Sequence, residues 1–155
     1  MTQSSNPIPP DYPRISPYLC VDGAAAAIDF YTRAFGAVEH MRLPMGDKLG
    51  HAEVKIGDSV VMLADPSPDV EFVPPTDAAA SSSHLMLYVA DVDTVTARAV
   101  ELGATVLQPP TTQFYGDRTA QIRDPFGHRW TLASQIERLT VDEVMQRMDS
   151  LGADE

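Results

Sequence analysis

The sequence predicts an α+β fold built from two β-α-β-β-β modules, and two features of the chain lead to this prediction. The first is an internal repeat, in which short apolar runs at 15–21 and 83–89 each lead into a helix that starts with aspartate and ends before glycine. The second is the set of three strand-like segments that follows each helix. Equivalent positions in the two halves lie at a nearly constant offset, which is typical of a duplicated structural unit.

The first module is expected to cover residues 14–64. Its helix is expected at 22–37, with Asp22 as the N-cap and Gly36 just past the end, because aspartate caps and terminal glycines are common helix boundaries. Runs rich in β-branched and apolar residues follow the helix and predict strands. These strands are expected at 37–43, 51–56 and 59–64.

The second module is expected to cover residues 84–135. Its helix starts at Asp91 or Asp93, either of which can serve as the N-cap, and ends before Gly103. The strands that follow this helix are expected at 104–108, 118–123 and 128–133.

The run DPFGHRW at 124–130 contains a histidine, His128, and the only tryptophan of the chain, Trp130. The residues DPFG are typical of a tight turn. A metal site and a plain hairpin are the two interpretations of this run. Its place in the repeat favours the hairpin, with Trp130 facing the core and His128 at the rim.

Three further segments flank or join the modules. Residues 1–13 are rich in proline and are expected to form a flexible N-terminal arm. Residues 65–83 are rich in proline, serine and alanine and predict a linker. Residues 136–155 are expected to form a C-terminal helix and tail. The helix follows a capping-box sequence, TVDE, and its apolar face consists of Val141, Val144, Met145 and Met148.

Composition excludes several classes of function. The chain has 155 residues and a net charge of −11, which argues against binding to nucleic acid or to anionic membranes, since both need a basic surface. No apolar run approaches the ~20 residues that cross a bilayer, and no signal peptide is recognisable, so a cytoplasmic location is expected. A single cysteine, Cys20, excludes an internal disulfide and a thiolate zinc cluster.

Several runs resemble one known family. FYTRAFGA at the end of the first helix and DPFGHRW at the last hairpin resemble the vicinal-oxygen-chelate superfamily, the glyoxalase, bleomycin-resistance and dioxygenase fold. SPYL, GHAEVKIGDSVVML and QFYGDR are most similar to its PhnB-like branch. The resemblance covers about residues 14–135 and implies a single domain over that range. It further implies a curved mixed sheet with helices on the convex side and a concave pocket, the cup.

The resemblance also indicates where metal-dependent relatives hold their ion, with one ligand from the first and one from the last strand of each module. Those positions fall on Ser16, Met62, His84 and Thr131. Catalytic Zn²⁺ or Ni²⁺ sites need about three nitrogen or carboxylate ligands. Because His84 is the only competent ligand among the four, no metal site is predicted, and His84 is assigned to a metal only if one is present.

Two titratable residues of the third strand are expected to face the cup. Side chains alternate along a strand, so if Val54 and Ile56 face the helices, His51 and Glu53 face the opposite side. His51 and Glu53 could form a general base with its orienting carboxylate, which makes them the predicted catalytic residues. The alternative is that they form an exposed polar face of an edge-like strand.

The predicted ligand-binding residues come from the strands and from the loop that contains QFYGDR. The strands contribute Tyr18, His84, Met86, Tyr88 and Gln121, and the loop contributes Phe114, Tyr115 and Arg118. Aromatic and polar groups together are typical of a small-ligand pocket. Arg118 could pair with an anionic group. The alternatives are a plain connecting loop and, for His84, a hydrogen-bonded histidine without a metal.

The expected function is therefore that of a glyoxalase- or bleomycin-resistance-like protein that binds a small metabolite or antibiotic, without the usual metal or any cofactor. The alternative is a glyoxalase-like lyase or isomerase whose Zn²⁺, Ni²⁺ or Fe²⁺ is held by a non-standard set such as His51, Glu53 and His84. A purely structural interaction module fits less well with an inward histidine and aromatic residues. Members of this fold usually pair their modules, so a homodimer is expected.

Overall fold

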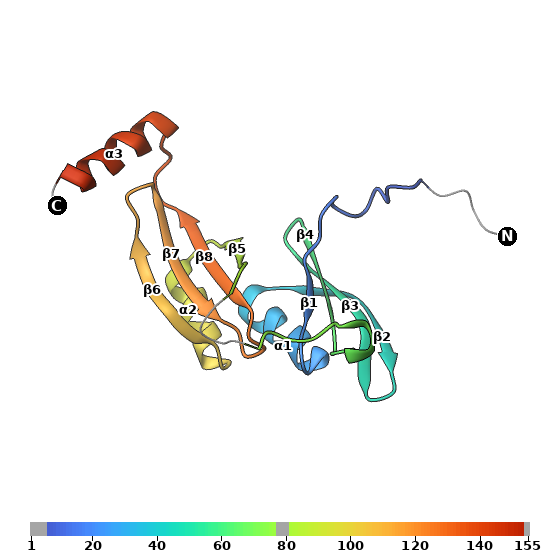
Figure 1. Ribbon diagram of the computed structural model, residues 1–155. Coiled ribbons are helices and arrows are strands. Elements are labelled where there is room, and N and C mark those ends of the chain that lie inside the picture. The colour runs from blue at the N-terminus through green and yellow to red at the C-terminus, as the bar shows by residue number, and fades with distance from the viewer. Residues whose placement is uncertain (1–5, 77–80, 154–155) are drawn as a thin grey trace. The chain divides into compact units, whose positions relative to one another are not determined.

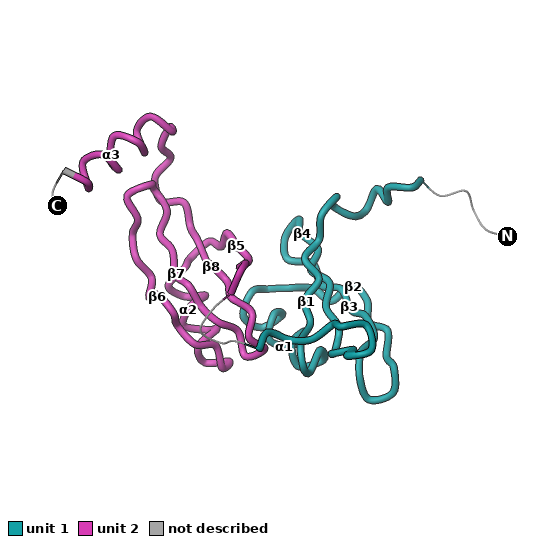
Figure 2. The backbone as a smooth tube through the Cα atoms, in the orientation of Figure 1, with its two compact units in different colours: residues 1–76 teal, residues 77–155 magenta. Residues whose placement is uncertain are grey.

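The computed structural model describes residues 6–76 and 81–153 of the chain. The remaining residues, at the start of the expected arm, inside the expected linker and at the end of the tail, lie outside the described residues. The chain divides into two compact units, residues 1–76 and 77–155, which Figure 2 shows in teal and magenta. Each unit holds one of the two predicted modules, so the α+β fold is confirmed.

Unit one contains a four-stranded mixed sheet with one helix packed on it. Its strands lie in the order β1-β4-β3-β2, where β1 is parallel to β4 and the other pairs are antiparallel. Helix α1 lies across one face of the sheet (Figure 1). The elements are β1 (Tyr18–Cys20), α1 (Ala24–Phe35), β2 (Val38–Met45), β3 (Lys48–Ile56) and β4 (Ser59–Ala64).

The start of α1 differs from the prediction. The N-cap residue is Gly23 rather than Asp22, and the capping carboxylate comes from Asp65, just after β4. Asp65 Oδ1 accepts hydrogen bonds from the backbone N–H groups of Gly23 (2.8 Å) and Ala24 (3.0 Å), and its Oδ2 accepts one from Leu49 N–H (2.7 Å). A single carboxylate thus ties the first turn of α1 to β3.

The first part of the expected linker is folded. Its short 3-10 helix, η1 (Pro68–Val70), lies inside a loop that closes on itself at Ser67 and Phe72. The backbone N–H of each of these two residues donates to the carbonyl of the other, at 2.8 and 3.1 Å. The Phe72 ring then packs edge-on against Tyr18 of β1, with ring centroids 5.3 Å apart.

Unit two repeats the same topology. Its strands lie in the order β5-β8-β7-β6, with β5 parallel to β8. Of the two candidate caps of its helix, Asp91 is the N-cap, because its side chain accepts a hydrogen bond from Thr94 N–H. The elements are β5 (Leu85–Tyr88), α2 (Val92–Glu101), β6 (Thr105–Thr112), β7 (Asp117–Arg123) and β8 (Arg129–Gln135).

The DPFG turn between β7 and β8 is organised by Asp124, which is buried. Its Oδ1 accepts hydrogen bonds from the backbone N–H groups of Phe126 and His128, each at 2.9 Å, and its Oδ2 accepts one from the Trp130 indole N–H at 2.9 Å. Trp130 itself is 2% exposed. The run DPFGHRW therefore forms the hairpin turn between β7 and β8 and places Trp130 in the core. This confirms the hairpin interpretation of the run.

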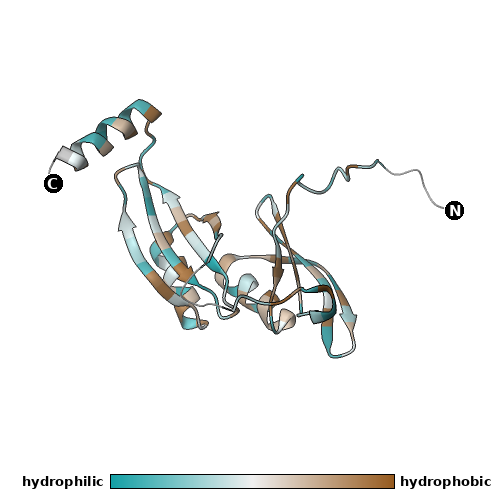
Figure 3. Ribbon diagram, in the orientation of Figure 1, coloured by the Kyte–Doolittle hydropathy of each residue, from teal (hydrophilic) through white to brown (hydrophobic). Residues whose placement is uncertain are grey.

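The C-terminal helix α3 (Val141–Ala153) projects from the end of β8 in unit two (Figure 1). The Thr140 hydroxyl accepts a hydrogen bond from Glu143 N–H, as expected of a capping box. Brown apolar and teal polar residues both lie along the helix in Figure 3. Within residues 6–76 and 81–153, no helix is long and apolar enough to cross a membrane.

Candidate functional site

Three side chains lie next to one another on the face of the unit-one sheet that α1 does not cover, which we call the open face. The strand register pairs Tyr18 of β1 with Met62 of β4, and Met62 with Glu53 of β3. His51 precedes Glu53 by two residues on β3, so strand alternation brings its side chain to the same face. The structure thus brings together Tyr18, His51 and Glu53, which the sequence assigned to ligand binding and catalysis.

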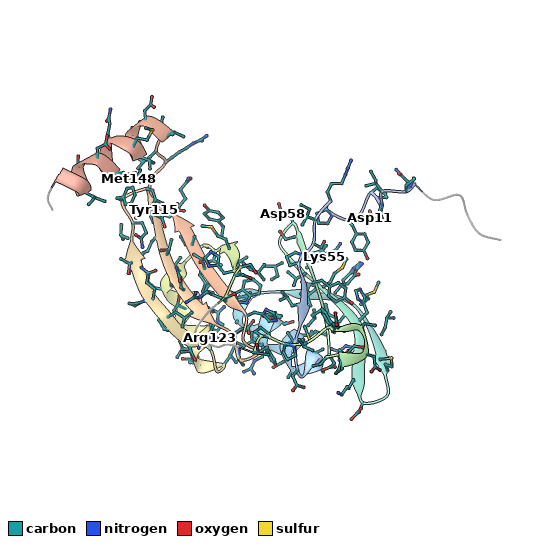
Figure 4. All side chains as sticks on the ribbon, viewed as in Figure 1. Asp11, Lys55, Asp58, Tyr115, Arg123 and Met148 are labelled. Carbon is teal, nitrogen blue, oxygen red and sulfur yellow. The ribbon has the colours of Figure 1, made fainter. Side chains whose placement is uncertain are left out.

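These side chains form a continuous chain of hydrogen bonds. His51 Nδ1 lies 2.5 Å from the Tyr18 hydroxyl, and His51 Nε2 lies 2.8 Å from Glu53 Oε2. The other carboxylate oxygen, Glu53 Oε1, accepts a hydrogen bond of 2.6 Å from the hydroxyl of Tyr12, in the N-terminal arm. Figure 4 shows the side chains of this arm, where Asp11 is labelled, and of β3, where Lys55 is labelled.

The partners determine the protonation of the neutral imidazole. A carboxylate can only accept, so His51 Nε2 carries the proton that is donated to Glu53. In neutral His51 the Nδ1 atom is then an acceptor, and the Tyr18 hydroxyl donates to it. The order Tyr18, His51, Glu53 has the arrangement of a hydroxyl, a base and an orienting carboxylate, which suits proton transfer to or from a ligand through Tyr18.

The pKa shifts of Glu53 and Tyr18 agree with this assignment. Burial raises the pKa of Glu53, but hydrogen bonds from His51 and Tyr12 and the nearby His40 lower it, and the net pKa lies below its ordinary value of 4.5. Glu53 is 4% exposed and is therefore a buried carboxylate. Burial and then the negative charge of Glu53 raise the pKa of Tyr18, so the Tyr18 hydroxyl stays protonated at neutral pH.

A cleft of about 390 Å³ adjoins Tyr18. Its volume falls within the range of roughly 300–1,000 Å³ that is usual for small-ligand pockets. Phe72 from the folded loop after β4 forms part of its wall, and Lys48 from the start of β3 is the one lysine or arginine among the described residues that line it. Its apolar wall is made by Tyr18, Met45, Leu49, Val70 and Phe72.

A second hollow of about 390 Å³ lies between the N-terminal arm and the sheet. Tyr12 and Arg14 line it from the arm side, and Glu53 and Met62 line it from the sheet side. The Tyr12 ring also meets the His40 ring edge-on, with centroids 6.2 Å apart. Glu53 is therefore reached from one side by His51 and from the other by the arm.

In unit two, the predicted residues Met86 and Tyr88 of β5 are exposed. The register places Met86 beside Thr131 of β8, and Thr131 beside Gln121 of β7. Thr131 is buried, and its hydroxyl has no hydrogen-bond partner within the described residues. The Tyr88 hydroxyl donates to Asp117, at 3.2 Å. These strand residues share one face, as alternation predicts, while their role in binding stays a prediction.

The sequence assigned Phe114, Tyr115 and Arg118 to one loop, but the structure places Arg118 in strand β7. The Arg118 guanidinium donates two hydrogen bonds to the Asp93 carboxylate on α2, at 2.7 and 2.9 Å. An anionic ligand would have to compete with that ion pair, so the structure gives no support to the predicted anion contact of Arg118. Phe114 and Tyr115 meet edge-on, with ring centroids 5.3 Å apart. His84 is exposed and lies just before β5.

The side chains at the four metal positions of the family do not fit a divalent metal ion. Ser16 and Met62 offer a hydroxyl and a thioether in unit one, while Thr131 offers a hydroxyl and His84 an imidazole in unit two. Only the imidazole is a usual ligand of Zn²⁺ or Ni²⁺. Among the described residues, no three or more histidine, cysteine, aspartate or glutamate side chains are grouped closely enough to hold a metal ion.

Sequence reasoning missed several residues that line the cleft and the hollow, and Tyr12 and Phe72 are the two on which the site depends most. Tyr12 lies in a proline-rich arm and Phe72 in a segment read as a linker, and neither segment has the periodicity of a strand or helix. The isolated aromatic ring in each polar, proline-rich segment was the one available signal. An aromatic ring in such a segment indicates a packing contact, but the sequence does not identify the partner.

Comparison with known proteins agrees with the fold and the duplication. A family model described as "Glyoxalase/Bleomycin resistance protein/Dioxygenase superfamily" matches residues 14–132. An uncharacterised protein of Mycobacterium bovis is 42% identical over 144 residues, which cover 90% of this chain and 95% of that protein.

Two solved structures are similar to the chain. TioX from Micromonospora sp. ML1 is 25% identical with a TM-score of 0.60, and the match covers 83% of this chain and all of TioX. A PhnB protein from Bacillus cereus, titled a putative 3-demethylubiquinone-9 3-methyltransferase, is 17% identical with a TM-score of 0.63 and covers 79% of this chain and 99% of its own. The second likeness shows the fold alone, so the PhnB-like branch stays a prediction.

Proposed function

Because the chain belongs to the glyoxalase, bleomycin-resistance and dioxygenase superfamily, we propose that it binds a small metabolite or antibiotic on the open face of unit one, without a metal. The ligand lies in the cleft whose wall includes Tyr18 and Phe72. Its apolar part is enclosed by the cleft wall, and one polar group faces the Tyr18 hydroxyl. The PhnB-like branch of the superfamily is part of this proposal.

The observation that carries the proposal is the double role of Tyr18. Its ring forms part of the cleft wall and packs on Phe72, while its hydroxyl begins the chain that leads to buried Glu53. A ligand in the cleft therefore meets apolar surface and a polar group with a fixed direction at the same time. This combination is what small-ligand pockets use for affinity and for orientation.

The binding test uses ligands found by a thermal-shift screen of metabolites and antibiotics, followed by calorimetric titration. Phe72→Ala should weaken the best ligand about tenfold or more, because enclosing an aromatic surface contributes roughly 1.5–3 kcal/mol and ~1.4 kcal/mol is one decade. The matched control is Val73→Ala, one residue further along and outside the cleft lining, which should change affinity less than about twofold. Unchanged affinity in Phe72→Ala would show that the ligand lies elsewhere.

The same hydrogen-bond chain favours a second function, that of a metal-free lyase or isomerase. His51 can take a proton from Tyr18 as Tyr18 takes one from an acidic C–H or O–H of the ligand, and Glu53 stabilises the imidazolium that results. The step needs no oxidant, since an isomerase returns the proton to a different atom of the ligand and a lyase returns it to the fragment that leaves.

Solvent exchange distinguishes this catalytic function from simple binding. The best ligand is incubated with the protein in D₂O and followed by NMR. An enzyme would incorporate deuterium at a carbon-bound position, and His51→Gln would abolish the exchange while leaving affinity within a few-fold. Binding with neither deuterium exchange nor a new product in the NMR spectrum would identify a binding protein and would exclude the enzymatic function for that ligand.

A further inference from the structure

We propose that Tyr12 is a tethered internal competitor, whose phenol occupies the place on Glu53 that the hydroxyl of a phenolic ligand takes. The proposal rests on the proposed function in placing the ligand on the open face of unit one. It adds the class of ligand, a phenol, and a way in which the N-terminal arm regulates access to the Glu53 end of the hydrogen-bond chain.

The arm is attached to the sheet mainly through Tyr12. Between residues 6 and 15, Tyr12 is half-buried and every other residue is exposed. The hydrogen bonds of Ile8 N–H and Tyr12 N–H are made to Asn6 and Pro9, within the arm itself. Release of the Tyr12 side chain would therefore free the described part of the arm without breaking a strand or a helix.

The place that Tyr12 occupies selects for a phenol. A buried carboxylate requires hydrogen-bond donors on both of its oxygens. His51 supplies the donor at Glu53 Oε2, and the Tyr12 hydroxyl supplies the one at Oε1, at 2.6 Å. The Tyr12 ring lies edge-on to His40. An aromatic ring with a hydroxyl group on it makes the ring contact and the hydrogen bond together, whereas a bare ring or a small alcohol makes only one of them.

The geometry also explains why Tyr12 would compete with a ligand rather than complete its site. The hollow of about 390 Å³ beside Tyr12 is lined by the arm on one side and by Glu53 and Met62 on the other, so displacement of the arm opens that side of the carboxylate. A short tether holds its group at an effective concentration on the order of millimolar. A free phenol competes with this tethered ring. If both have the same affinity for the site, the phenol must exceed the effective concentration of the ring before it replaces Tyr12.

The experiment measures binding of 4-methylphenol, which is the side chain of tyrosine without its backbone, by ¹H–¹⁵N NMR titration of the full chain. Tyr12→Ala should bind 4-methylphenol at least about threefold more tightly than the natural chain, with the largest shifts at residues 51–54 and 62. The matched control is Ile8→Ala, which removes an exposed apolar side chain from the same arm and should leave the affinity unchanged. Toluene, which lacks the hydroxyl, should produce no saturable shifts at these residues.

Three results would overturn the proposal. The first is equal or weaker binding of 4-methylphenol in Tyr12→Ala, and the second is equal binding of toluene. The third is the absence of saturable binding of 4-methylphenol to either chain at concentrations up to about 20 mM, well above the effective concentration of the tethered ring. A third variant, Glu53→Gln, should lose the preference for 4-methylphenol over toluene. Failure of the proposed function is recognised separately, because it is tested at Phe72 with the screened ligand. Displacement of Tyr12 by a phenol does not depend on that result.

Discussion

Asp65 and Asp124 show how single aspartates hold each module together. Each buried or half-buried carboxylate accepts three hydrogen bonds, Asp65 from backbone groups of α1 and β3, and Asp124 from its own turn and from Trp130. A carboxylate that satisfies several buried donors is costly to remove, because each donor is left without a partner. At this scale, the chemistry of one side chain decides where a helix begins or how a hairpin closes.

The first prediction concerns Asp65. Replacement by alanine should lower the free energy of unfolding by about 1–2 kcal/mol, as is typical for loss of an N-cap, measured by urea denaturation at pH 7. The control is Asp22→Ala, which removes the neighbouring aspartate that does not cap α1 and should change stability by less than about 0.5 kcal/mol. Equal effects of the two changes would contradict the assignment of the cap to Asp65.

The pH dependence of this effect has a definite sign. Burial raises the pKa of Asp65, but its hydrogen bonds from Leu49, Ala24 and Gly23 and the charge of Lys48 lower it, and the net pKa lies below 3.8. A carboxyl group with a lowered pKa in the folded state stabilises the fold above its unfolded pKa and loses that contribution as the pH falls. The stability difference between the natural chain and Asp65→Ala should therefore shrink as the pH is lowered below about 4.

At the scale of elements, the loop before β7 depends on one glycine. Gly116 has a φ of +98°, and a Cβ atom placed there would lie 2.3 Å from the carbonyl oxygen of Glu137. The Gly116 carbonyl accepts hydrogen bonds from the N–H groups of Ile136 and Glu137, at 2.9 and 3.0 Å. The loop and the segment after β8 are thus in backbone contact, with no room for a side chain.

The second prediction is that Gly116→Ala lowers the free energy of unfolding by about 1–3 kcal/mol, since it combines a left-handed backbone with an overlap against backbone atoms. Gly152→Ala is the matched control, because nothing lies within 4 Å of a Cβ at that position of α3. A glycine-to-alanine change inside a helix should be neutral or stabilising by up to about 1 kcal/mol. The urea midpoint of both variants measures the difference.

Helix α3 carries the expected apolar face in an exposed position. Val141, Met145 and Met148 are 75%, 53% and 52% exposed. Met148 is labelled in Figure 4 together with Tyr115, in the loop before β7. Arg147 attaches the helix to its own unit through one hydrogen bond to the Phe114 carbonyl (3.1 Å) and through an ion pair with Glu137. Within the described residues of unit two, Val141, Met145 and Met148 of the apolar face therefore stay exposed, while Val144 is half-buried.

The third prediction is that the protein is a homodimer whose interface includes this face of α3. Light scattering at tens of micromolar should give twice the mass of 16.9 kDa for one chain. Met145→Glu should shift the mass towards the monomer, whereas Gln146→Glu, on the opposite side of the helix, should not. A monomer mass for the natural chain at that concentration would show the prediction to be wrong.

At the scale of the whole molecule, the duplication produces two sheets of the same topology that carry different side chains on equivalent faces. The equivalent strand rows contain Tyr18, Met62 and Glu53 in unit one, and Met86, Thr131 and Gln121 in unit two. In these rows the first face carries titratable groups and the second neutral ones, and the second face has a titratable pair of its own, Tyr88 and Asp117. The duplicated backbone therefore supports two separate chemical environments.

The fourth prediction follows from the side chains at the family's metal positions in both units. After purification without a chelator, Zn²⁺, Ni²⁺ and Fe²⁺ should each be well below one ion per chain by mass spectrometry, because one imidazole among four positions is too few ligands. His84→Ala should leave the metal content as it is. A stoichiometric metal that disappears in His84→Ala would contradict the assignment of these positions.

The sequence by itself determined the features that depend on neighbours along the chain. The repeat predicted both modules, strand alternation predicted that His51 and Glu53 share a face with Tyr18, and the DPFG turn predicted the last hairpin. The reason is that helices, strands and turns have short periods, so a few residues are enough to specify them. The part of the site that lies on β1 and β3 could therefore be predicted from sequence.

Only the tertiary structure decided the features that join distant parts of the chain. Asp65 rather than Asp22 caps α1, Phe72 packs on Tyr18, and Tyr12 donates to Glu53, which lies 41 positions further along the sequence. Each contact depends on which side chain reaches an unsatisfied group once the sheet has formed. A buried carboxylate or backbone N–H must find a partner, but the chain pattern does not say which one, because that is settled by distance in space.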